Sequence, residues 1–426
     1  MINYVLKNFL LIISIVLFTN FSFSDDSPLP KGTPESVGIS ADRLKRIESV
    51  FNTGIAEGRI PGAVIGIARK GKLVFFKAFG MQNAAKNVPM STDSIFRIYS
   101  MTKPLVSIGA MILHEEGKLY LSEPVEKYIP EFKNMKVAKT SIQDTNSNAI
   151  AIIDAKRKIK IHDLLLHTSG LTYGFYGNSP AKNILKASGI GNLNKMDIDL
   201  KQYVFELTKL PLAYQPGEHW EYGRSTDVLG HLIEIVSEKS LDNFMVESVF
   251  KPLNMKDTDF WVPEKKWPRI AEPLDNKGEP ELINIKKQPK LLSAGHGLAS
   301  TVGDYIRFCQ MMLDKGILDN TRILGSKTVE YISSNHLGKD YISRKGPYYL
   351  PGPGYGFGLG FAVREDDGVS PWPGSIGEYF WGGYAGTYFW IDPKEELVVV
   401  SMTQSVKNRM EYRMLLRNLV YQAILK

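Results

Sequence analysis

Strand signals at both ends of the chain limit its fold more than any other feature. Residues 62–80, GAVIGIARKGKLVFFKAFG, hold two β-rich runs separated by a Lys-Gly pair, which predicts a hairpin. Strand patterns return only in the last third, at 354–363, 379–392 and 395–402. Because hairpins join neighbouring strands and no strand–helix–strand alternation occurs, we expect one antiparallel sheet built from both ends of the chain.

The middle of the chain, residues 119–290, shows mostly helical patterns interrupted by Pro- and Gly-containing loops, and 225–250 is a clear example. We therefore expect an α/β fold of the α+β type, in which an antiparallel β-sheet is flanked by helices and carries an inserted, mainly helical domain. The sheet subdomain would span about 25–118 plus 291–426, and the helical subdomain about 119–290. Residues 133–156 within the helical part resemble a loop excursion.

The N-terminus has the pattern of an export signal. Lys7 is the only charge before an apolar run at 9–18, and small residues follow at Ser22 and Ser24. The alternative is a membrane anchor, but the run is shorter than the roughly 20 apolar residues of a spanning helix. We expect a signal peptide at 1–24 that is cleaved after Ser24, a secreted or periplasmic protein, and no stable membrane anchor.

Charge and cysteine usage narrow the class of protein further. The formal net charge is +7, but the lysines are scattered, which favours a solvated surface over a nucleic-acid partner. Cys309 is the only cysteine, so no intramolecular disulfide can form. It lies in the apolar helical pattern YIRFCQMML, which predicts a buried thiol rather than a nucleophile.

We expect neither a metal nor a cofactor. The histidines that could attract attention have no ligand spacing, and structural roles are expected for them; they are His162, His167, His219 and His296. Residues 66–72 match the beginning of a phosphate-binding loop, but Leu73 follows where a hydroxyl is needed, and the loop joins strand to strand. Nucleotide binding is therefore not predicted.

Ser100 and Lys103 stand three positions apart in IYSMTKPL, but that spacing alone carries no information. With 31 serines and 37 lysines in 426 residues, chance placement gives about 2.7 Ser-x-x-Lys matches. The chain contains three such pairs: Ser100–Lys103, Ser179–Lys182 and Ser248–Lys251. The context of Ser100 must therefore decide whether it is a nucleophile.

Ser100 lies where a strand-rich segment gives way to a helical pattern. At a helix start its N–H would be an unpaired donor, and the helix dipole would favour a developing oxyanion. Lys103, one turn further, would lie on the same face. By contrast, Ser179 precedes a proline inside a loop, and Ser248 lies inside a helix near its end. A simple helix cap remains the alternative for Ser100.

Five segments in order give the chain a resemblance to a known family. They are FRIYSMTKPL, IHDLLLHTSGL, PGEHWEYGRSTDVLG, GHGLASTVGDYIRFCQMML and GTYFWIDPKEELVVVSMTQ. Together they resemble the superfamily of serine β-lactamases and penicillin-binding proteins, and most closely the class C β-lactamase-like esterases, often named family VIII carboxylesterases. The resemblance implies an antiparallel sheet beside a helical domain, with the active site between them.

The resemblance also implies roles for individual residues. Ser100 would be the acylated nucleophile and Lys103 its partner, while Tyr222 matches the tyrosine that acts as general base in a Tyr-x-Asn element. The N–H groups of Ser100 and Tyr384 would form the oxyanion hole. Free tyrosine and lysine titrate near 10 and 10.4, so either base needs burial or a nearby charge to act near pH 7. Whether Lys103 or Tyr222 takes the serine proton stays open.

Two departures from the β-lactamase pattern bear on the substrate. Arg224 stands at the asparagine position of Tyr-x-Asn, and Trp381-Gly382-Gly383 replaces the triad Lys-Thr/Ser-Gly. In β-lactamases that lysine helps to bind the substrate carboxylate, whereas Trp-Gly-Gly is similar to the esterase branch. We expect these four residues to contact the substrate, with tryptophan offering a stacking face and one N–H donor.

The prediction is an exported serine hydrolase, a carboxylesterase for small or short-chain esters that works through an acyl-enzyme without a cofactor. One alternative is a β-lactamase, D-amino-acid amidase or DD-peptidase of the same superfamily, because Arg224 could partly substitute for the missing lysine. The alternative of another class is a non-catalytic, cell-wall-binding relative. The sequence leaves the natural substrate and the oligomeric state open.

Overall fold

The computed structural model describes residues 27–140, 150–191, 197–275, 279–338, 344 and 348–425. The predicted signal peptide at 1–24 lies outside the described residues. Among the described residues, no helix combines the length and the apolar character that crossing a bilayer requires.

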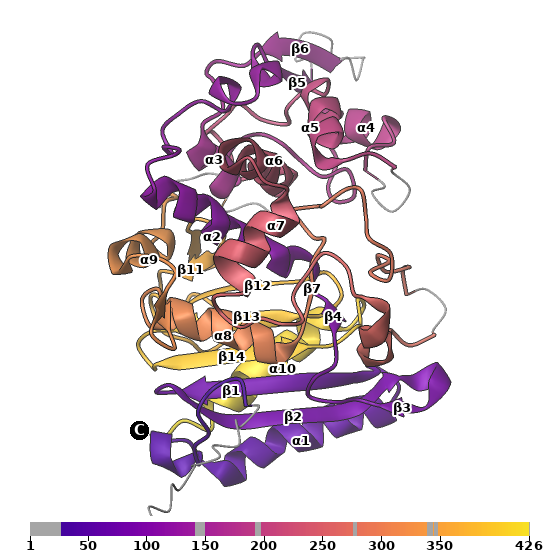
Figure 1. The fold of residues 1–426 in the computed structure, drawn as a ribbon, viewed down its shortest axis with the longest axis vertical. Coiled ribbons are helices and arrows are strands. Elements are labelled where there is room, and N and C mark those ends of the chain that lie inside the picture. Colours follow the sequence, from indigo (N-terminus) through magenta and orange to yellow (C-terminus); the bar gives the residue numbers. More distant parts are fainter. Residues whose placement is uncertain are drawn as a thin grey trace, which may run out of the picture.

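One eight-stranded sheet forms the base of the molecule (Figure 1). Its order is β10-β11-β12-β13-β14-β1-β2-β3, and every neighbouring pair is antiparallel. The strands are Gly62–Arg69 (β1), Lys72–Asn83 (β2), Val88–Pro89 (β3), Tyr355–Phe357 (β10), Ala362–Arg364 (β11), Tyr379–Gly382 (β12), Tyr388–Asp392 (β13) and Leu397–Met402 (β14). Because β1 pairs with both β2 and β14, the two ends of the chain build one sheet, and the predicted fold class is confirmed.

Helices cover both faces of this sheet. Helices α1 (Ala41–Ala56) and α10 (Arg409–Tyr421) pack together on one face, where Ile65 and Trp390 belong to their apolar cluster. Helix α8 (Val302–Leu313) packs against β1, β13 and β14 on the other face. All residues of β1 and β14 are buried as a result, which explains why these strands are almost continuously apolar instead of alternating.

Most helices between residues 119 and 290 lie at the opposite end of the molecule from α1, and α7 (Leu241–Met245) lies between them and the sheet (Figure 1). The other α-helices are α3 (Ile161–Leu165), α4 (Pro180–Ala187), α5 (Leu200–Thr208) and α6 (Ser225–Ser237). Helix α2 (Thr102–Glu115), which starts directly after Ser100, packs mainly against α6 and so joins this part to the sheet. The predicted boundaries near residues 118 and 291 stay predictions.

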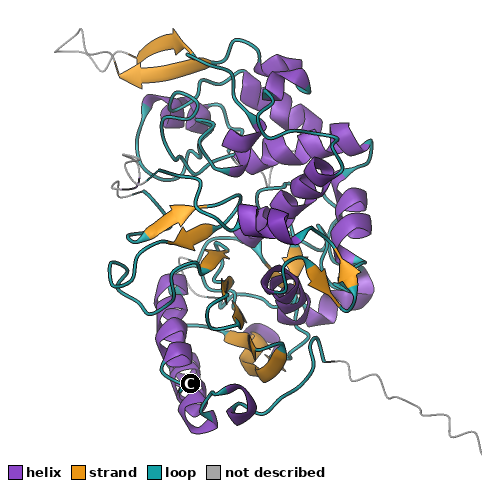
Figure 2. Cartoon of the chain, turned by 90° about the vertical axis from the view of Figure 1, so that its left-hand side faces the viewer, coloured by secondary structure: helices purple, strands orange, loops and turns teal. Residues whose placement is uncertain are grey.

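Two described parts of the stretch at 133–156 are strands, where the sequence suggested a loop. This stretch contains a hairpin of β5 (Lys136–Thr140) and β6 (Ile150–Asp154), with Val137 opposite Ile153. Figure 2 shows this hairpin projecting from the helical end of the molecule. Val137 is buried whereas most of β6 is exposed, and the sequence IAIID of β6 lacks the alternation of apolar and polar residues that indicates a strand with one buried face.

Short elements complete the chain. The short strands are Phe96–Arg97 (β4), Ala299–Ser300 (β7), Ile317–Leu318 (β8) and Thr321–Arg322 (β9), and α9 spans Ser326–Ile332. The short helical turns are Glu35–Val37 (η1), Ala84–Lys86 (η2), Tyr99–Met101 (η3), Val125–Lys127 (η4), Pro130–Phe132 (η5), Val246–Phe250 (η7) and Glu264–Arg269 (η8). Strand β4 pairs with β7 and leads directly into η3, so this small ladder fixes the approach to Ser100.

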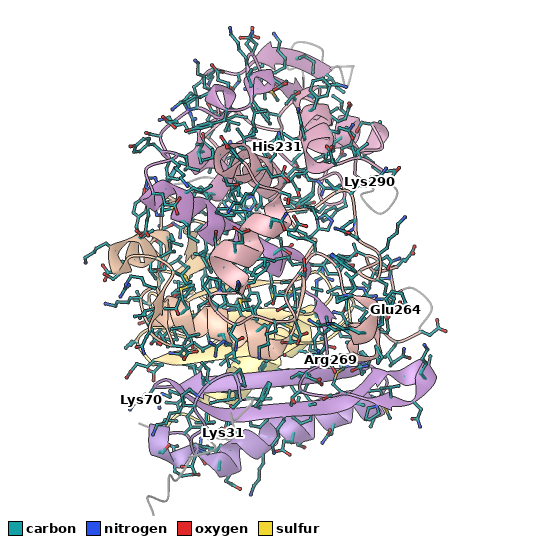
Figure 3. The ribbon with its side chains drawn as sticks, in the orientation of Figure 1. Lys31, Lys70, His231, Glu264, Arg269 and Lys290 are labelled. Carbon is teal, nitrogen blue, oxygen red and sulfur yellow. The ribbon has the colours of Figure 1, made fainter. Side chains whose placement is uncertain are left out.

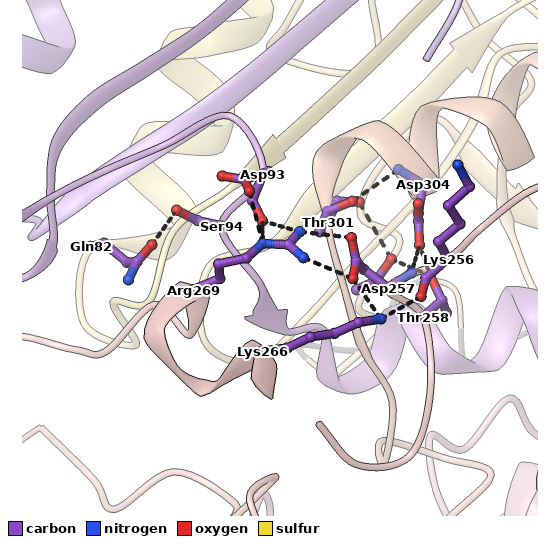
Figure 4. A network of polar contacts seen from close by, with 11 residues as sticks. Gln82, Asp93, Ser94, Lys256, Asp257, Thr258, Lys266, Arg269, Thr301 and Asp304 are labelled. Atoms are coloured by element: carbon purple, nitrogen blue, oxygen red, sulfur yellow. Dashed lines mark hydrogen bonds and ion pairs between the residues drawn. The ribbon is translucent and has the colours of Figure 1, made fainter. Parts of the chain in front are cut away.

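A charged network holds the segment next to that ladder (Figure 4). Arg269 donates to both carboxylate oxygens of Asp257, at 3.0 and 2.7 Å. The Asp304 carboxylate accepts from the Asp257 N–H at 2.7 Å and the Thr258 hydroxyl at 2.8 Å. Burial raises the pKa of Asp304 to about 6. Figure 3 places Arg269 near the β1–β2 hairpin and His231 at the helical end, so this network belongs to the sheet end of the molecule.

Candidate active site

Ser100 is presented by a strained turn. It lies in η3, and the preceding Tyr99 has a φ of 45°, in the left-handed region that costs a residue other than glycine about 1–3 kcal/mol. The caps of η3 and α2 are Ile98 and Met101, and neither makes a side-chain capping bond. Ser100 is therefore not a helix cap, and its half-buried hydroxyl accepts a hydrogen bond from Lys103 Nζ at 3.5 Å.

Lys103 is a buried cation without a carboxylate partner. Its side chain is 1% exposed, and Nζ donates to the Gly295 carbonyl at 2.7 Å and the Tyr173 hydroxyl at 3.2 Å besides Ser100. No aspartate or glutamate in the described part of the chain forms an ion pair with it. Burial opposes the charge, but attraction from Tyr173 and Tyr222 outweighs burial and raises the pKa of Lys103. The lysine is thus an ammonium ion whose three donors are all used.

Tyr222 lies between this cation and Trp381. Lys103 Nζ is 4.7 Å from the centroid of the Tyr222 ring, within the range of a cation–π contact. On its other side the Tyr222 hydroxyl accepts a hydrogen bond from Trp381 Nε1 at 3.3 Å. Tyr222 stands just before α6 and Trp381 stands on β12, so the fold brings Ser100, Lys103, Tyr222 and Trp381 together from three distant segments.

The glycines after Trp381 bring the chain close to the nucleophile. A Cβ atom on Gly383 would clash with the carbonyl oxygen of Ile98, two residues before Ser100. Gly382 instead faces Arg413 of α10, since a Cβ there would meet the guanidinium. Tyr384 follows this close approach, and its ring lies 5.6 Å from that of Tyr99. No described residue accepts a hydrogen bond from the Tyr384 N–H, which fits the predicted oxyanion hole; the role itself stays a prediction.

Arg224 lies behind the site. Its guanidinium is buried over the Tyr173 ring, 4.5 Å from the centroid, and Nη1 is 3.8 Å from Asp227 Oδ2. Burial opposes its charge, but Tyr203, Tyr173 and Asp227 outweigh burial and raise the pKa of Arg224. Both the guanidinium and Lys103 Nζ contact Tyr173, and the predicted contact of Arg224 with substrate stays a prediction.

Tyr173 was missed by the sequence reasoning. Its hydroxyl is the second phenol at Lys103, and its ring lies 5.4 Å from that of Tyr222. Burial raises the pKa of Tyr173, while Lys103 and Arg224 oppose this shift. The one sequence signal was its place directly after the family segment IHDLLLHTSGL, because the loop LTYGFYG has no periodic pattern.

The described residues offer little to a metal ion. No group of three or more His, Cys, Asp or Glu side chains in the described ranges is arranged to hold one. His162 and His336 pair with each other, Nε2 to Nδ1 at 3.1 Å, and His219 stacks on Tyr214.

Comparison with known proteins agrees with this geometry. The family model described as Beta-lactamase matches residues 47–423. Protein Rv1367c of Mycobacterium tuberculosis is 32% identical over 363 residues, covering 82% of this chain and 86% of that protein. Esterase EstB of Burkholderia gladioli is 28% identical over 413 residues, covering 91% of this chain and 98% of that protein.

Solved structures share the fold over nearly the whole chain. EstCE1, described as a hydrolase with promiscuous acyltransferase activity, superposes with a TM-score of 0.75 at 26% identity, covering 89% of this chain and 99% of that one. Simvastatin synthase (LovD) from Aspergillus terreus superposes with a TM-score of 0.71 at 23% identity, covering 90% of this chain and 98% of that one. At this identity the similarity supports the fold alone. The predicted resemblance is thus confirmed: the chain belongs to the beta-lactamase family and is a serine hydrolase.

Proposed function

We propose that the protein is a carboxylesterase that hydrolyses small or short-chain esters through an acyl-enzyme on Ser100. The observation that carries the proposal is Trp381, whose indole N–H donates to the Tyr222 hydroxyl at 3.3 Å. Trp381 stands where the β-lactamase pattern has a lysine for the substrate carboxylate. The names of two relatives, Esterase EstB and the hydrolase EstCE1, support the same reaction class.

Tyr222 is the proton acceptor in this proposal. Lys103 has no lone pair to offer, because its pKa is raised and its donors are engaged. The Lys103 ammonium and the Trp381 N–H both contact Tyr222 and would stabilise the negative charge that moves between Tyr222 and Ser100 as the proton is transferred. Lys103 Nζ also lies 3.5 Å from Ser100 Oγ, so one cation adjoins both the proton donor and the proton acceptor.

The reaction then has two matching halves. Ser100 Oγ loses its proton to Tyr222 and attacks the ester carbonyl, and the oxyanion of the tetrahedral intermediate binds the N–H groups of Ser100 and Tyr384. Tyr222 returns the proton to the departing alcohol, which leaves the acyl group on Ser100. Water repeats the sequence: it gives a proton to Tyr222, attacks the acyl carbonyl, and releases the acid with the proton back on Ser100.

Cation placement supports esters over β-lactams. A β-lactam carries a carboxylate that needs a cation within reach of the nucleophile. Lys103 is committed to Ser100, Tyr173 and Gly295, and Arg224 is buried over the Tyr173 ring. A neutral ester needs no such cation.

A substrate comparison tests the proposal. Purified protein should hydrolyse p-nitrophenyl acetate and butyrate with a higher kcat/KM than nitrocefin, and a fluorophosphonate probe located by mass spectrometry should label Ser100. Ser100→Ala is the matched control for both measurements. A preference for nitrocefin would overturn the carboxylesterase assignment. Absence of both labelling and turnover would instead favour the non-catalytic, cell-wall-binding alternative.

We also propose that the protein is exported. Support comes from the charge at Lys7, the apolar run at 9–18 and the small residues Ser22 and Ser24. Expression of the full chain in a Gram-negative host, followed by fractionation and N-terminal sequencing, should give a mature protein that starts at Asp25 outside the cytoplasm. An intact N-terminus on cytoplasmic protein would contradict export.

A further inference from the structure

Next to Lys103, three side chains form a hydrogen-bonded relay that the proposed reaction does not use. The fully buried Asp227 accepts from the Ser293 hydroxyl at 2.7 Å and from the Gly295 N–H at 3.0 Å, both on Oδ1. Ser293 Oγ is in turn 2.9 Å from His296 Nδ1. The relay therefore runs from a carboxylate through a hydroxyl to an imidazole. Gly295, whose N–H donates to the same carboxylate, also binds Lys103 through its carbonyl oxygen.

The relay fixes the tautomer of His296. A hydroxyl has one proton, and Ser293 gives it to the Asp227 carboxylate. Ser293 Oγ can therefore only accept from His296, so the ring proton must be on Nδ1. Burial lowers the pKa of His296 to about 3, and Lys103 and Arg224 add to this against the opposing charge of Asp227. The ring is neutral near pH 7, and its Nε2 carries a lone pair that can only accept.

His296 also lies beside Tyr99, the residue before Ser100. Its ring is nearly parallel to that of Tyr99, at 13° and 6.4 Å between centroids. The chain just after it runs along the approach to Ser100, since the Ile98 N–H donates to the Leu298 carbonyl at 3.0 Å. The side chain is partly exposed, and Nε2 makes no hydrogen bond to any residue in the described ranges. An acceptor of fixed orientation is thus left open at the edge of the active site.

The relay is costly if it only packs the ring. Asp227 is fully buried, and its Oδ2 has no hydrogen-bond donor among the described residues; the nearest charge is Arg224 at 3.8 Å. A buried carboxylate oxygen left in this way costs about 1–3 kcal/mol or more. An apolar aromatic side chain at 296 would stack on Tyr99 without needing the Ser293 hydroxyl or the buried carboxylate behind it. Packing on Tyr99 does not require a fixed tautomer of His296. The relay fixes that tautomer and so holds the Nε2 lone pair in place.

We propose that His296 Nε2 accepts a hydrogen bond from a hydroxyl or amide N–H of the substrate. The enzyme would then prefer esters whose acyl group carries such a donor a few atoms from the scissile carbonyl. This inference rests on the proposed esterase function and narrows its substrate class. A polar group that a site is built to bind gives more discrimination than an added methylene.

The test compares the p-nitrophenyl esters of three acids, which are butyrate, 2-hydroxybutyrate and 3-hydroxybutyrate. Each ester is assayed with the unmodified protein and with each variant. His296→Phe keeps an aromatic ring on Tyr99 but removes the acceptor. The ratio of kcat/KM for a hydroxylated ester to kcat/KM for the butyrate ester should be about 3- to 10-fold lower in His296→Phe than in the unmodified protein, for at least one hydroxylated ester. That factor is the size of one neutral hydrogen bond. The loss should appear mainly in KM, because the bond forms on binding. His296→Gln, which retains an acceptor oxygen, should recover part of the ratio.

Two features keep this experiment decisive. The ratio is taken within one protein sample, so a variant that folds less well does not mimic the effect. Ser293→Ala leaves His296 in place but frees its tautomer, and it should lower the same ratio by a smaller factor. If His296→Phe changes all three esters equally, the inference is overturned while the esterase proposal stands. If the unmodified protein hydrolyses none of the three, the esterase proposal itself fails.

Discussion

Two Ser-x-x-Lys pairs in this molecule have the same spacing and similar burial, yet only one has the surroundings of a catalytic site. Lys103 and Lys182 are 1% and 4% exposed. Each lies over two tyrosine rings: Lys103 is 4.7 and 5.6 Å from the centroids of Tyr222 and Tyr173, and Lys182 is 4.6 and 5.4 Å from those of Tyr176 and Tyr348. Neither spacing, burial nor aromatic contact separates the two pairs.

Their other partners do separate them. Lys182 forms an ion pair with Glu221 at 3.0 Å, and the Ser179 hydroxyl caps α4 by accepting from the Lys182 N–H at 3.4 Å. Lys103 has no carboxylate, and Ser100 caps nothing. The charge of Lys182 is compensated within the fold, whereas that of Lys103 acts on a serine and two phenols. A buried lysine without a carboxylate is therefore the feature that marks the site.

The nucleophile should show the largest difference between the pairs. Ser100→Ala should lower kcat on p-nitrophenyl butyrate by at least about 10⁴-fold, because no other group can form the acyl-enzyme. Ser179→Ala, which removes the same hydroxyl from the other pair, should keep kcat within about two-fold. Steady-state assays on both variants check this. Equal losses would mean that Ser100 is not the nucleophile.

Removing each lysine should have opposite consequences for stability and activity. Lys182→Met leaves the buried Glu221 carboxylate without its ion pair and should lower the free energy of unfolding by about 3–5 kcal/mol. Lys103→Met breaks no ion pair but removes a positive charge that acts on Asp227 and the donor to the Gly295 carbonyl, so it should abolish turnover while the free energy of unfolding falls by about 1–3 kcal/mol, less than for Lys182→Met.

Urea unfolding and ester hydrolysis measured on both lysine variants decide between these effects. If Lys103→Met lowers the free energy of unfolding as much as Lys182→Met does, the proposed difference between the two lysines is wrong. Lys103 would then be a structural cation as well. Glu221→Gln offers a second route to the same ion pair. It should destabilise the protein to a similar extent, because Lys182 is then the uncompensated buried charge.

Tyrosine substitutions test whether the hydroxyl of Tyr222, and not only its ring, is needed next to Lys103. Tyr222→Phe keeps the ring under the ammonium but removes the hydroxyl, and should lower kcat by about 10²-fold or more, as expected for a lost general base. The matched control is Tyr203→Phe, because Tyr203 is fully buried and its hydroxyl has no partner among the described residues. That control should leave kcat unchanged. A similar rate for both variants would remove Tyr222 from the mechanism.

The sequence predicted the parts of the site that lie in linear motifs. Ser100, Lys103 and Tyr222 could be named because each stands in a family segment, and Trp381 because it replaces the lysine of the family triad. The antiparallel sheet followed from strand patterns at both ends. Tyr173 could not be found in this way, because its contact with Lys103 joins residues 70 positions apart. The Asp227–Ser293–His296 relay was missed for the same reason, and the isolated His296 carried no signal before the fold placed it beside Tyr99.

The smallest expected effect concerns the helix cap that distinguishes Ser179 from Ser100. The Ser179 hydroxyl accepts one of the N–H groups at the start of α4, which otherwise have no acceptor within the helix. Ser179→Ala should therefore lower the free energy of unfolding by about 1 kcal/mol, whereas Ser179→Asp, which retains an acceptor, should not. Ser100→Ala removes no cap and should change stability by less than about 0.5 kcal/mol. Urea denaturation of the three variants measures these differences, and a stability loss for Ser100→Ala as large as that for Ser179→Ala would show that the hydroxyl of Ser100 also serves the fold.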